Sequence, residues 1–308
     1  MSEKFPPLVS VIIPYYNEVA FLKESILSIL NQTFTDFELV ILDDGSKSSA
    51  EEIILSFNDS RIRYIRGENV GLANNINRSI GLLKGKFVAR LDQDDVSKPE
   101  RLKKQLELFH NIPEADCVFS YIKRFGSKKG WTEKPLISTQ KYHKFEPFTD
   151  GCMVHSTMMV KKEVLIALNG YRQEYYPADD WDLELRMCHR YNIFILEEEL
   201  VNYRIHEGAN TFRTYSLMQN TRRWAEENYL RRQKNVNEIS FEEYYKNKSF
   251  ADKLRHWRKD NAKLNVRIAG NYYLKNKKSV AFFYILKAFI FHPNTILKRF
   301  KFMFAKQK

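Results

Sequence analysis

The sequence predicts an α/β fold in which helices cover both faces of a mostly parallel central sheet. Four short apolar runs have the length of buried strands, and they lie at residues 8–13, 37–42, 62–65 and 87–91. Between them, segments such as 19–30 and 72–83 carry apolar residues at helical spacing. Strands that alternate with helices in this way form parallel sheets, because each crossover helix packs back onto the sheet.

Polar side chains follow three of these strands at the point where each strand ends. The clusters are Tyr15-Tyr16-Asn17-Glu18, Asp43-Asp44 and Asp92-Gln93-Asp94-Asp95. Ligands of open parallel sheets bind outside the carboxyl ends of the strands. Because the three clusters fall at equivalent positions, we expect them to line one crevice.

The third cluster places three carboxylates within four positions, directly after an apolar run. Like charges this close repel and raise one another's pKa. A hard divalent cation offsets such repulsion, and Mg2+ is commonly held by one or two carboxylates plus the phosphates of a substrate. The cluster therefore indicates a metal-bound diphosphate. An isolated cluster would instead indicate a solvated acidic loop before a helix, but the matching clusters on the other strands favour the metal site.

A second acidic group, Asp179-Asp180-Trp181-Asp182, opens a helix that is predicted to run through His189. A carboxylate at this position can cap the helix or accept the proton of a substrate hydroxyl within its reach. A strand is predicted at residues 201–205, and His206 follows its end. His155 precedes a short apolar run and is expected to pack in the core.

The chain has 308 residues and a net charge of +12, which suits one large domain or one domain with an extension. Nine Lys or Arg and no acidic residue lie between positions 275 and 308, so the positive charge is concentrated in this tail. Such a surface indicates a polyanionic partner: nucleic acid, an anionic membrane or a phosphorylated substrate. Because no RNA- or DNA-binding motif is present, nucleic acid is not the expected partner.

From about residue 215 the pattern changes to long helical segments rich in basic and aromatic residues. Residues 279–304 are amphipathic, and Pro293 is expected to separate two helices. Basic residues beside aromatic ones on a helix are typical of an element that lies in a membrane interface. The alternative is a helix that packs on the body of the protein and leaves its Lys and Arg in solvent.

The cysteines Cys117, Cys152 and Cys188 are widely spaced and odd in number, so neither a disulfide framework nor a zinc site is indicated. Neither a signal peptide nor an apolar stretch long enough to span a bilayer is visible. We therefore expect a cytoplasmic protein that is peripheral on the inner face of the cell membrane.

Several segments taken together resemble family 2 glycosyltransferases. They are residues 9–18, 28–34, 37–46 and 69–72, followed by the carboxylate cluster. The resemblance covers roughly residues 8–207 and leaves out the tail. The segment at residues 89–95 is most similar to bacterial members that build surface polysaccharide or lipooligosaccharide.

The resemblance implies a GT-A catalytic domain at residues 1–212, with a nucleotide-sugar half at about 1–95 and an acceptor half at about 96–212. A helical, basic C-terminal extension would occupy residues 213–308. The implied reaction is an inverting transfer of a hexose or N-acetylhexosamine from a UDP-sugar to a saccharide or lipid-linked saccharide. This hexosyltransferase would serve bacterial surface glycan synthesis and depend on Mn2+ or Mg2+.

The resemblance also assigns roles to individual residues on the donor side. The nucleotide-sugar-binding positions are Pro14, Tyr16, Glu18, Asp44 and Asp92. Among them, Pro14 and Tyr16 would line the uracil pocket, with the Tyr16 ring available for stacking. Asp44 would accept a hydrogen bond from the uracil.

On the reaction side, Asp92 and Asp94 match the D-x-D positions. Asp94 would contact the metal directly, and Asp92 would reach the ribose or the metal. His206 matches a late histidine that completes the metal shell, with a hydrogen-bonding core role as the alternative. Asp180 matches the general base, and its two acidic neighbours on the same helix are the alternatives to it.

Two other functions are compatible with parts of the sequence. The basic tail is compatible with sugar transfer to a polyprenyl phosphate carrier, and a short soluble saccharide as acceptor would count against that function. The second alternative is a non-enzymatic protein that holds a polyanion with its +12 charge. Salt-dependent binding to a random duplex, without UDP binding, would favour it.

Overall fold

The computed structural model describes residues 5–47, 50–125, 141–206 and 214–297. The chain divides into two compact units, one of which contains residues 5–125 and 141–204. The other contains the described residues from Ile205 onward. The predicted boundary between catalytic domain and extension, at residues 212 and 213, lies outside the described residues.

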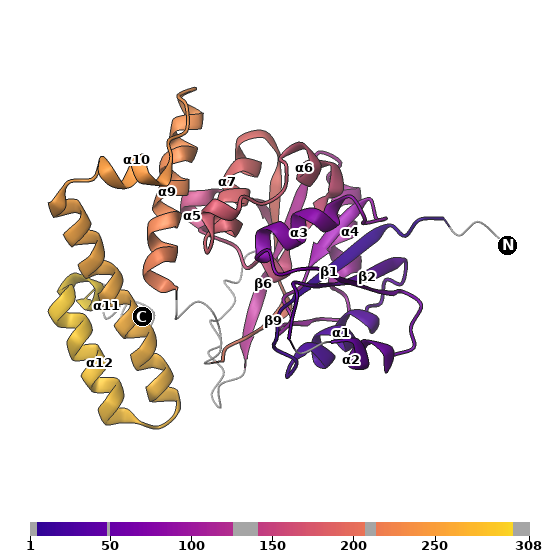
Figure 1. Cartoon of the computed structure of the whole chain (residues 1–308), viewed down its shortest axis with the longest axis horizontal. Coiled ribbons are helices and arrows are strands. Elements are labelled where there is room, and N and C mark those ends of the chain that lie inside the picture. The colour runs from indigo at the N-terminus through magenta and orange to yellow at the C-terminus, as the bar shows by residue number, and fades with distance from the viewer. Residues whose placement is uncertain (1–4, 48–49, 126–140, 207–213, 298–308) are drawn as a thin grey trace. The chain divides into compact units, whose positions relative to one another are not determined.

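The first unit is built on one sheet of mixed direction (Figure 1). Its strand order is β3-β2-β1-β4-β8-β6-β9-β5, and β7 pairs with β9 beside this path. The strands are β1 Val9–Tyr15, β2 Phe37–Asp43, β3 Ile62–Arg66, β4 Phe87–Arg90, β5 Val96–Ser97, β6 Cys117–Phe125, β7 Tyr142–Lys144, β8 Met159–Lys161 and β9 Ile193–Arg204.

The four predicted strands are present, and β3, β2, β1 and β4 run parallel to one another. In the other half, β6 and β9 are parallel, whereas β8, β5 and β7 pair antiparallel with their neighbours. The parallel arrangement predicted from the first strands therefore applies to the half that contains the three polar clusters. The second half is mixed.

Helices connect the strands of this unit. They are α1 Leu22–Leu30, α2 Glu51–Leu55, α3 Leu72–Ile80, α4 Arg101–Asn111, α5 Pro147–Asp150, α6 Lys162–Ala167 and α7 Asp179–Arg190, with short 3-10 turns η1 His155–Thr157 and η2 Gln173–Tyr175. Helix α3 packs on β1 and β2, and α4 packs on β6 and β9. Every residue of β1 and β2 is buried, as continuous apolar strands of a covered sheet require.

One buried carboxylate, Glu38, stands near the start of β2, at the edge of the sheet opposite the polar clusters. It accepts hydrogen bonds from the Ser10 hydroxyl at 2.6 Å, from the Lys84 N–H at 2.6 Å and from Arg63. Burial raises the pKa of Glu38, but these hydrogen bonds outweigh burial and bring it below its usual 4.5.

The described residues of the second unit include the helices α9 Tyr215–Gln233, α10 Phe241–Lys246, α11 Phe250–Leu274 and α12 Lys278–Phe291. Ser240 and Ser249 cap α10 and α11, because each side chain accepts a hydrogen bond from the backbone N–H three residues later. Helices α11 and α12 pack side by side over a small core of Ala262, Val266 and Ala288 (Figure 1).

The predicted break at Pro293 is observed, because α12 ends at Phe291 and residues 293–297 are helical again. The remainder of the predicted second helix lies outside the described residues. None of the described helices has the length and apolar character needed to cross a membrane. All three cysteines are outside disulfides; Cys117 is buried, and the other two are partly exposed.

Candidate active site

The carboxyl ends of β1, β2 and β4 lie at the same edge of the sheet. Tyr15, the last residue of β1, is in register with Asp43, the last residue of β2. The next residue, Asp44, donates its N–H to the Tyr15 carbonyl at 3.0 Å. The Tyr16 N–H donates to the side chain of Gln93 at 3.0 Å. The three polar clusters therefore meet, as the positions of the strand ends predict.

The residues predicted to hold the nucleobase have contrasting environments. Pro14 is buried within β1, whereas the Tyr16 side chain is 49% exposed. Asp44 is buried, and its two carboxylate oxygens accept the backbone N–H groups of Val70 at 2.9 Å and Gly71 at 3.0 Å. Because each carboxylate oxygen has two lone pairs, Asp44 keeps acceptor capacity for a ligand. The half-exposed Tyr16 ring therefore offers a face on which a base can stack.

The neighbours of these two residues have structural contacts. Asp43 is fully buried, and its carboxylate accepts the Ser46 N–H at 2.8 Å and the Tyr64 hydroxyl. Asp43 therefore supports the turn after β2. Glu18 is exposed, and its carboxylate accepts the Ala20 N–H at 3.2 Å. Its assignment to the nucleotide-sugar site stays a prediction.

The three carboxylates of the acidic cluster occupy different positions. Asp92 is partly exposed and pairs with the guanidinium of Arg90 at 3.0 Å. Asp94 is also partly exposed, and its backbone carbonyl accepts Arg204 Nε at 2.7 Å. Asp95, to which the resemblance assigns no role, is fully buried, and it accepts the Ser156 hydroxyl and the Arg204 N–H at 2.8 Å. Asp95 thus anchors the acidic loop to η1 and to the end of β9.

Arginines supply part of the positive charge that the cluster needs. Arg90 contacts Asp92, and Arg101 is fully buried nearby. Burial lowers the pKa of Arg101 to about 9, and the charges of Asp95 and Asp92 oppose this shift. These arginines therefore offset part of the repulsion for which the sequence suggested a divalent cation. Burial, followed by the charges of Asp92 and Asp94, still raises the pKa of Asp95 to about 8.

The donor set fits a divalent cation bound together with a diphosphate. Asp92 and Asp94 provide hard oxygen ligands that are partly exposed. Across the described part of the chain, no three side chains of His, Cys, Asp or Glu converge on one point. Mg2+ sites completed by substrate phosphates need only one or two protein carboxylates. His206 follows Arg204 by two residues but belongs to the second unit, and its role as a ligand stays a prediction.

The first turn of α7 carries the three carboxylates that were candidates for the general base. Asp182 is fully buried and forms ion pairs with Arg172 at 2.6 Å and Arg186 at 2.8 Å. Asp179 is buried, and burial together with the nearby Asp180 raises its pKa to about 7. Asp180 is partly exposed, and one oxygen accepts the Trp181 N–H at 2.7 Å. Of the three, Asp180 is the carboxylate that is partly exposed to solvent.

A buried polar network joins the acidic cluster to α7. The Arg90 guanidinium, which holds Asp92, also lies 3.2 Å from His155 Nδ1. The other ring nitrogen of His155 lies 3.2 Å from a carboxylate oxygen of Glu184. Glu184 is one turn beyond Asp180 on α7. Burial, together with the charge of Arg90, holds the pKa of His155 well below its usual value, so the ring is neutral.

Sequence reasoning missed the arginines of this site and the link through His155. His155 is buried, as predicted, but it is a hydrogen-bonded member of the network. The available signal was Arg90 itself, a single charge inside an apolar run that ends at the acidic cluster. A buried charge needs partners, so the position of Arg90 indicates a polar network.

Comparison with known proteins agrees with this geometry. The family model described as glycosyl transferase family 2 matches residues 10–168. The chain is 37% identical to an uncharacterised glycosyltransferase of Methanocaldococcus jannaschii over 68% of this chain and 75% of the relative. It is 33% identical to the O-antigen biosynthesis glycosyltransferase WbnJ of Escherichia coli, over 68% of this chain and 84% of the relative.

Solved structures show the same fold. The structure of S. aureus TarS in complex with UDP-GlcNAc aligns with a TM-score of 0.59 and 16% identity, over 90% of this chain and 89% of that chain. The complex of TarS with UDP aligns with a TM-score of 0.56 and 15% identity, over 92% of this chain and 88% of that chain. The likeness shows that the chain has a GT-A fold.

Proposed function

The chain belongs to glycosyl transferase family 2 and is a glycosyltransferase; from this premise we propose that it transfers a hexose or N-acetylhexosamine from a UDP-sugar to a saccharide acceptor with inversion. One observation carries the proposal. The guanidinium that holds Asp92 also contacts His155, which contacts the helix that carries Asp180. One buried network thus connects Asp92 to the helix that carries Asp180, which supports placing donor and base in one site. The membership decides against the non-enzymatic alternative.

The donor site is proposed at the ends of β1 and β2. The Tyr16 ring would stack on the uracil, and Asp44 would accept a hydrogen bond from it beside its two backbone contacts. The related structures of TarS were solved with UDP and UDP-GlcNAc, which supports a UDP-sugar here.

Asp180 is proposed as the general base. The acceptor hydroxyl is a poor nucleophile at neutral pH, and a carboxylate within hydrogen-bond reach takes its proton in the transition state. The Trp181 N–H donates to one oxygen of this partly exposed carboxylate and so orients it. Attack from the face opposite the diphosphate inverts the anomeric carbon. A single base suffices, so no covalent glycosyl-enzyme forms.

Asp94, with Asp92, is proposed to hold Mn2+ or Mg2+ together with the diphosphate of the donor. When bound, the cation neutralises the negative charge that develops on the departing diphosphate. The contribution of the protein is to orient the two carboxylates. Arg90 fixes Asp92, and Arg204 fixes the backbone of Asp94.

A screen of nucleotide sugars by thermal unfolding, with Mn2+ present, tests the proposed donor. A ligand at about 100 times its Kd stabilises by about 2.7 kcal/mol, which corresponds to a rise in Tm of roughly 5–10 °C for a domain of this size. We expect UDP-sugars to raise the Tm and GDP-sugars to leave it unchanged. If no UDP-sugar raises the Tm, the proposed donor is contradicted.

We propose a surface glycan as the product, because WbnJ, at 33% identity, is described as an O-antigen biosynthesis enzyme. Transfer to a polyprenyl phosphate is the alternative that one observation favours, namely the exposed apolar side chains of α12. A transfer assay with a short soluble saccharide separates the two. Sugar transfer to that saccharide would exclude an obligatory lipid acceptor.

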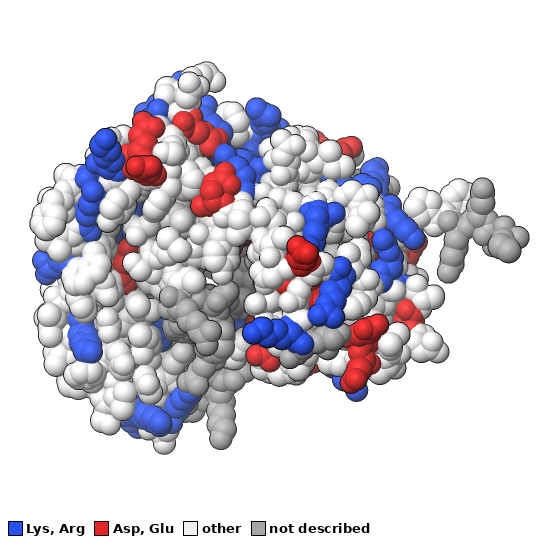
Figure 2. All heavy atoms as spheres, in the orientation of Figure 1, with Lys and Arg blue, Asp and Glu red and all other residues white. Residues whose placement is uncertain are grey.

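We also propose that α12 lies on an anionic membrane at the cytoplasmic face. Phe282, Phe283 and Ile290 are 69%, 51% and 66% exposed. The surface over this helix is mostly uncharged, with isolated Lys and Arg (Figure 2). The sequence adds Lys298, Arg299 and further basic residues after it. Exposed aromatic residues with basic neighbours bind anionic interfaces.

Vesicle flotation tests the membrane proposal. Phe282→Ser with Ile290→Ser should release the protein from anionic vesicles, while the small core beneath α12 stays intact. Leu55→Ser is the matched control, because Leu55 is 70% exposed on α2 of the other unit. Deletion of residues 279–308 should release the protein as well. Equal vesicle binding by all forms would refute the proposal.

A further inference from the structure

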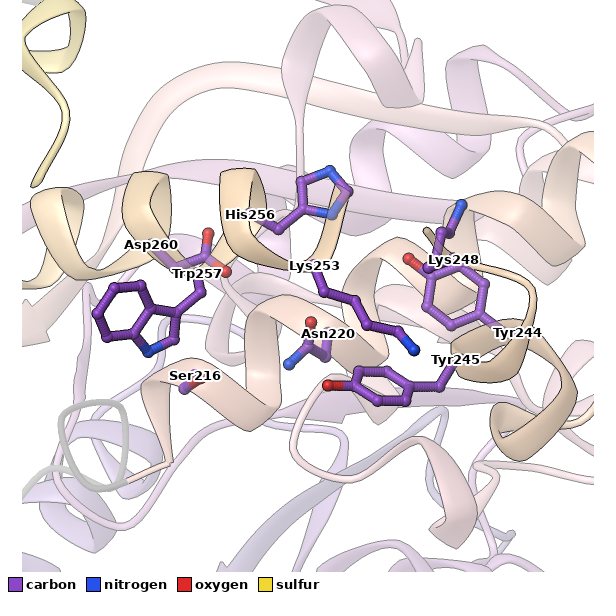
Figure 3. A pocket seen from close by; sticks show the side chains of 9 residues that line it. All are labelled: Ser216, Asn220, Tyr244, Tyr245, Lys248, Lys253, His256, Trp257 and Asp260. Atoms are coloured by element: carbon purple, nitrogen blue, oxygen red, sulfur yellow. The ribbon is translucent and has the colours of Figure 1, made fainter. Parts of the chain in front are cut away.

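A cavity within the second unit is separate from the residues discussed above (Figure 3). Its volume is about 150 Å³, and it is lined by residues from α9, from α10 and the turn that follows it, and from α11. One water takes up about 30 Å³ in the liquid, so this volume corresponds to roughly five waters. That is the space of a single sugar ring with its substituents. The lining residues used below are Asn220, Tyr245, Lys248, Lys253, His256 and Trp257.

Two exposed aromatic residues, Trp257 and Tyr245, line the cavity from different sides (Figure 3). Trp257 is 50% exposed, and its ring packs against Phe291 at 5.3 Å in an edge-on arrangement. Tyr245 is 45% exposed. Exposed, positioned aromatic rings give apolar contact area at a low cost in conformational entropy. The C–H face of a pyranose ring is the matching surface for such an aromatic ring.

The same cavity carries positive charge. The Lys253 ammonium lies 4.4 Å from the centre of the Tyr245 ring, and no ion pair joins Lys253 to a carboxylate of the described residues. Lys248 lines the cavity as well and lies 4.0 Å from Glu227, at the outer limit of an ion pair. Burial, followed by the charge of Arg223, lowers the pKa of His256.

The one carboxylate in the lining is already neutralised. Both oxygens of Asp260 contact the Arg223 guanidinium, at 2.6 Å and 3.1 Å. Arg223 also donates to the side-chain oxygen of Asn220 at 2.8 Å. This contact leaves the amide N–H groups of Asn220 as donors. In Figure 3 the Asn220 amide lies between the Trp257 indole and the pair formed by Lys253 and Tyr245.

We propose that this cavity binds an anionic saccharide, a hexose-sized ring with a phosphate or carboxylate group, as part of the acceptor. The inference rests on the proposed function in taking a saccharide as the acceptor. Trp257 covers one face of the ring, Asn220 donates to a hydroxyl, and Lys253 with Lys248 neutralises the anion. A neutral sugar would leave the lysines unmatched, and a bare phosphate would leave Trp257 uncovered.

Calorimetric binding to the full chain tests the proposal with four probes: glucose 6-phosphate, glucuronate, glucose and inorganic phosphate. We expect at least one of the two anionic sugars to bind about tenfold more tightly than glucose and inorganic phosphate, since a hydrogen bond to a charged group is worth about that factor. The stronger of glucose 6-phosphate and glucuronate identifies the anion as phosphate or carboxylate.

Two variants and one control locate the binding. Lys253→Gln and Trp257→Ala should each weaken binding of the anionic sugar by about tenfold. Lys246→Gln changes the net charge equally on an exposed residue of α10 that does not line the cavity, so it should bind as the wild type does. Because Trp257 also packs on Phe291, Lys253→Gln is the less disruptive variant, and its Tm confirms folding.

Equal binding by the wild type and both cavity variants, or the absence of binding by any anionic sugar, would overturn the inference. UDP-sugar hydrolysis, measured on the same preparations, keeps the two proposals apart. Hydrolysis without anionic-sugar binding would refute this inference alone. Cavity-dependent binding without any use of UDP-sugars would refute the proposed donor instead.

Discussion

Asp180 and Asp182 lie two residues apart on α7, and we expect replacement by asparagine to impair turnover at Asp180 and stability at Asp182. Asp180 is partly exposed, and its carboxylate accepts a hydrogen bond from the Trp181 N–H. An asparagine oxygen accepts that hydrogen bond equally well, so Asp180→Asn should fold normally. Asp182 is fully buried between Arg172 and Arg186. Asp182→Asn leaves two guanidinium groups without their counter-charge.

The two magnitudes follow from these environments. Loss of a general base lowers a rate by about 100- to 10,000-fold, which corresponds to roughly 2.7–5.4 kcal/mol of activation free energy. Removal of one partner from a buried ion pair costs about 3–5 kcal/mol of stability. For a domain of this size, that loss lowers the Tm by roughly 6–20 °C. Asp180→Asn should therefore lose turnover, and Asp182→Asn should lose stability.

The assay combines sugar transfer, UDP titration and thermal unfolding on both variants and the wild type. For Asp180→Asn we expect a collapsed kcat, a normal Tm and a UDP affinity close to that of the wild type. Folded Asp182→Asn, measured below its lowered Tm, should retain most of its turnover. Wild-type turnover in Asp180→Asn would refute its role as base. A larger loss of turnover in Asp182→Asn than in Asp180→Asn would favour Asp182 as the base instead.

Three further predictions follow from the described contacts. EDTA should stop transfer and Mn2+ or Mg2+ should restore it, with Asp94→Asn needing more metal for half-maximal rate; undiminished transfer in EDTA would exclude the metal site. Arg90→Lys should weaken UDP-sugar binding and lower the Tm, because one ammonium cannot hold both Asp92 and His155; a titration with unchanged affinity would contradict this. The hydrogen bonds of Glu38 lower its pKa below 4.5, so they contribute stability above pH 4.5 that is lost as the pH falls through the lower folded value. Urea unfolding of Glu38→Gln as a function of pH should lack this acid-side loss, and an unchanged pH profile would argue against it.

The strand ends illustrate how far sequence reasoning reaches into the site. The apolar runs and their polar ends were sufficient to place Tyr16, Asp44 and Asp92 at one edge, because the carboxyl ends of parallel strands share an edge. For the strands after β4, no comparable rule predicts from chain order which strands pair or in which direction. The mixed pairing of β8, β6 and β9 depends on contacts between segments far apart in the sequence, which no local pattern encodes.

The acidic cluster shows the same division. Its three carboxylates are alike as a sequence, and the choice of Asp94 over Asp95 for the metal came from the resemblance alone. The tertiary structure separates them by burial, since Asp95 is held by Ser156 and Arg204 from distant elements. A pattern of residue types cannot state which of several neighbouring carboxylates keeps contact with solvent.

By itself the sequence determined the α/β class, the family and the meeting of three polar clusters, because strand length, helical spacing and motif order are local properties of the chain. Only the tertiary structure decided which carboxylate of α7 is accessible and that Arg90 joins Asp92 to His155. It also decided that three helices of the second unit line a cavity with basic and aromatic side chains. These properties depend on burial and on the partners of each charge, and both are set by residues that are remote in sequence.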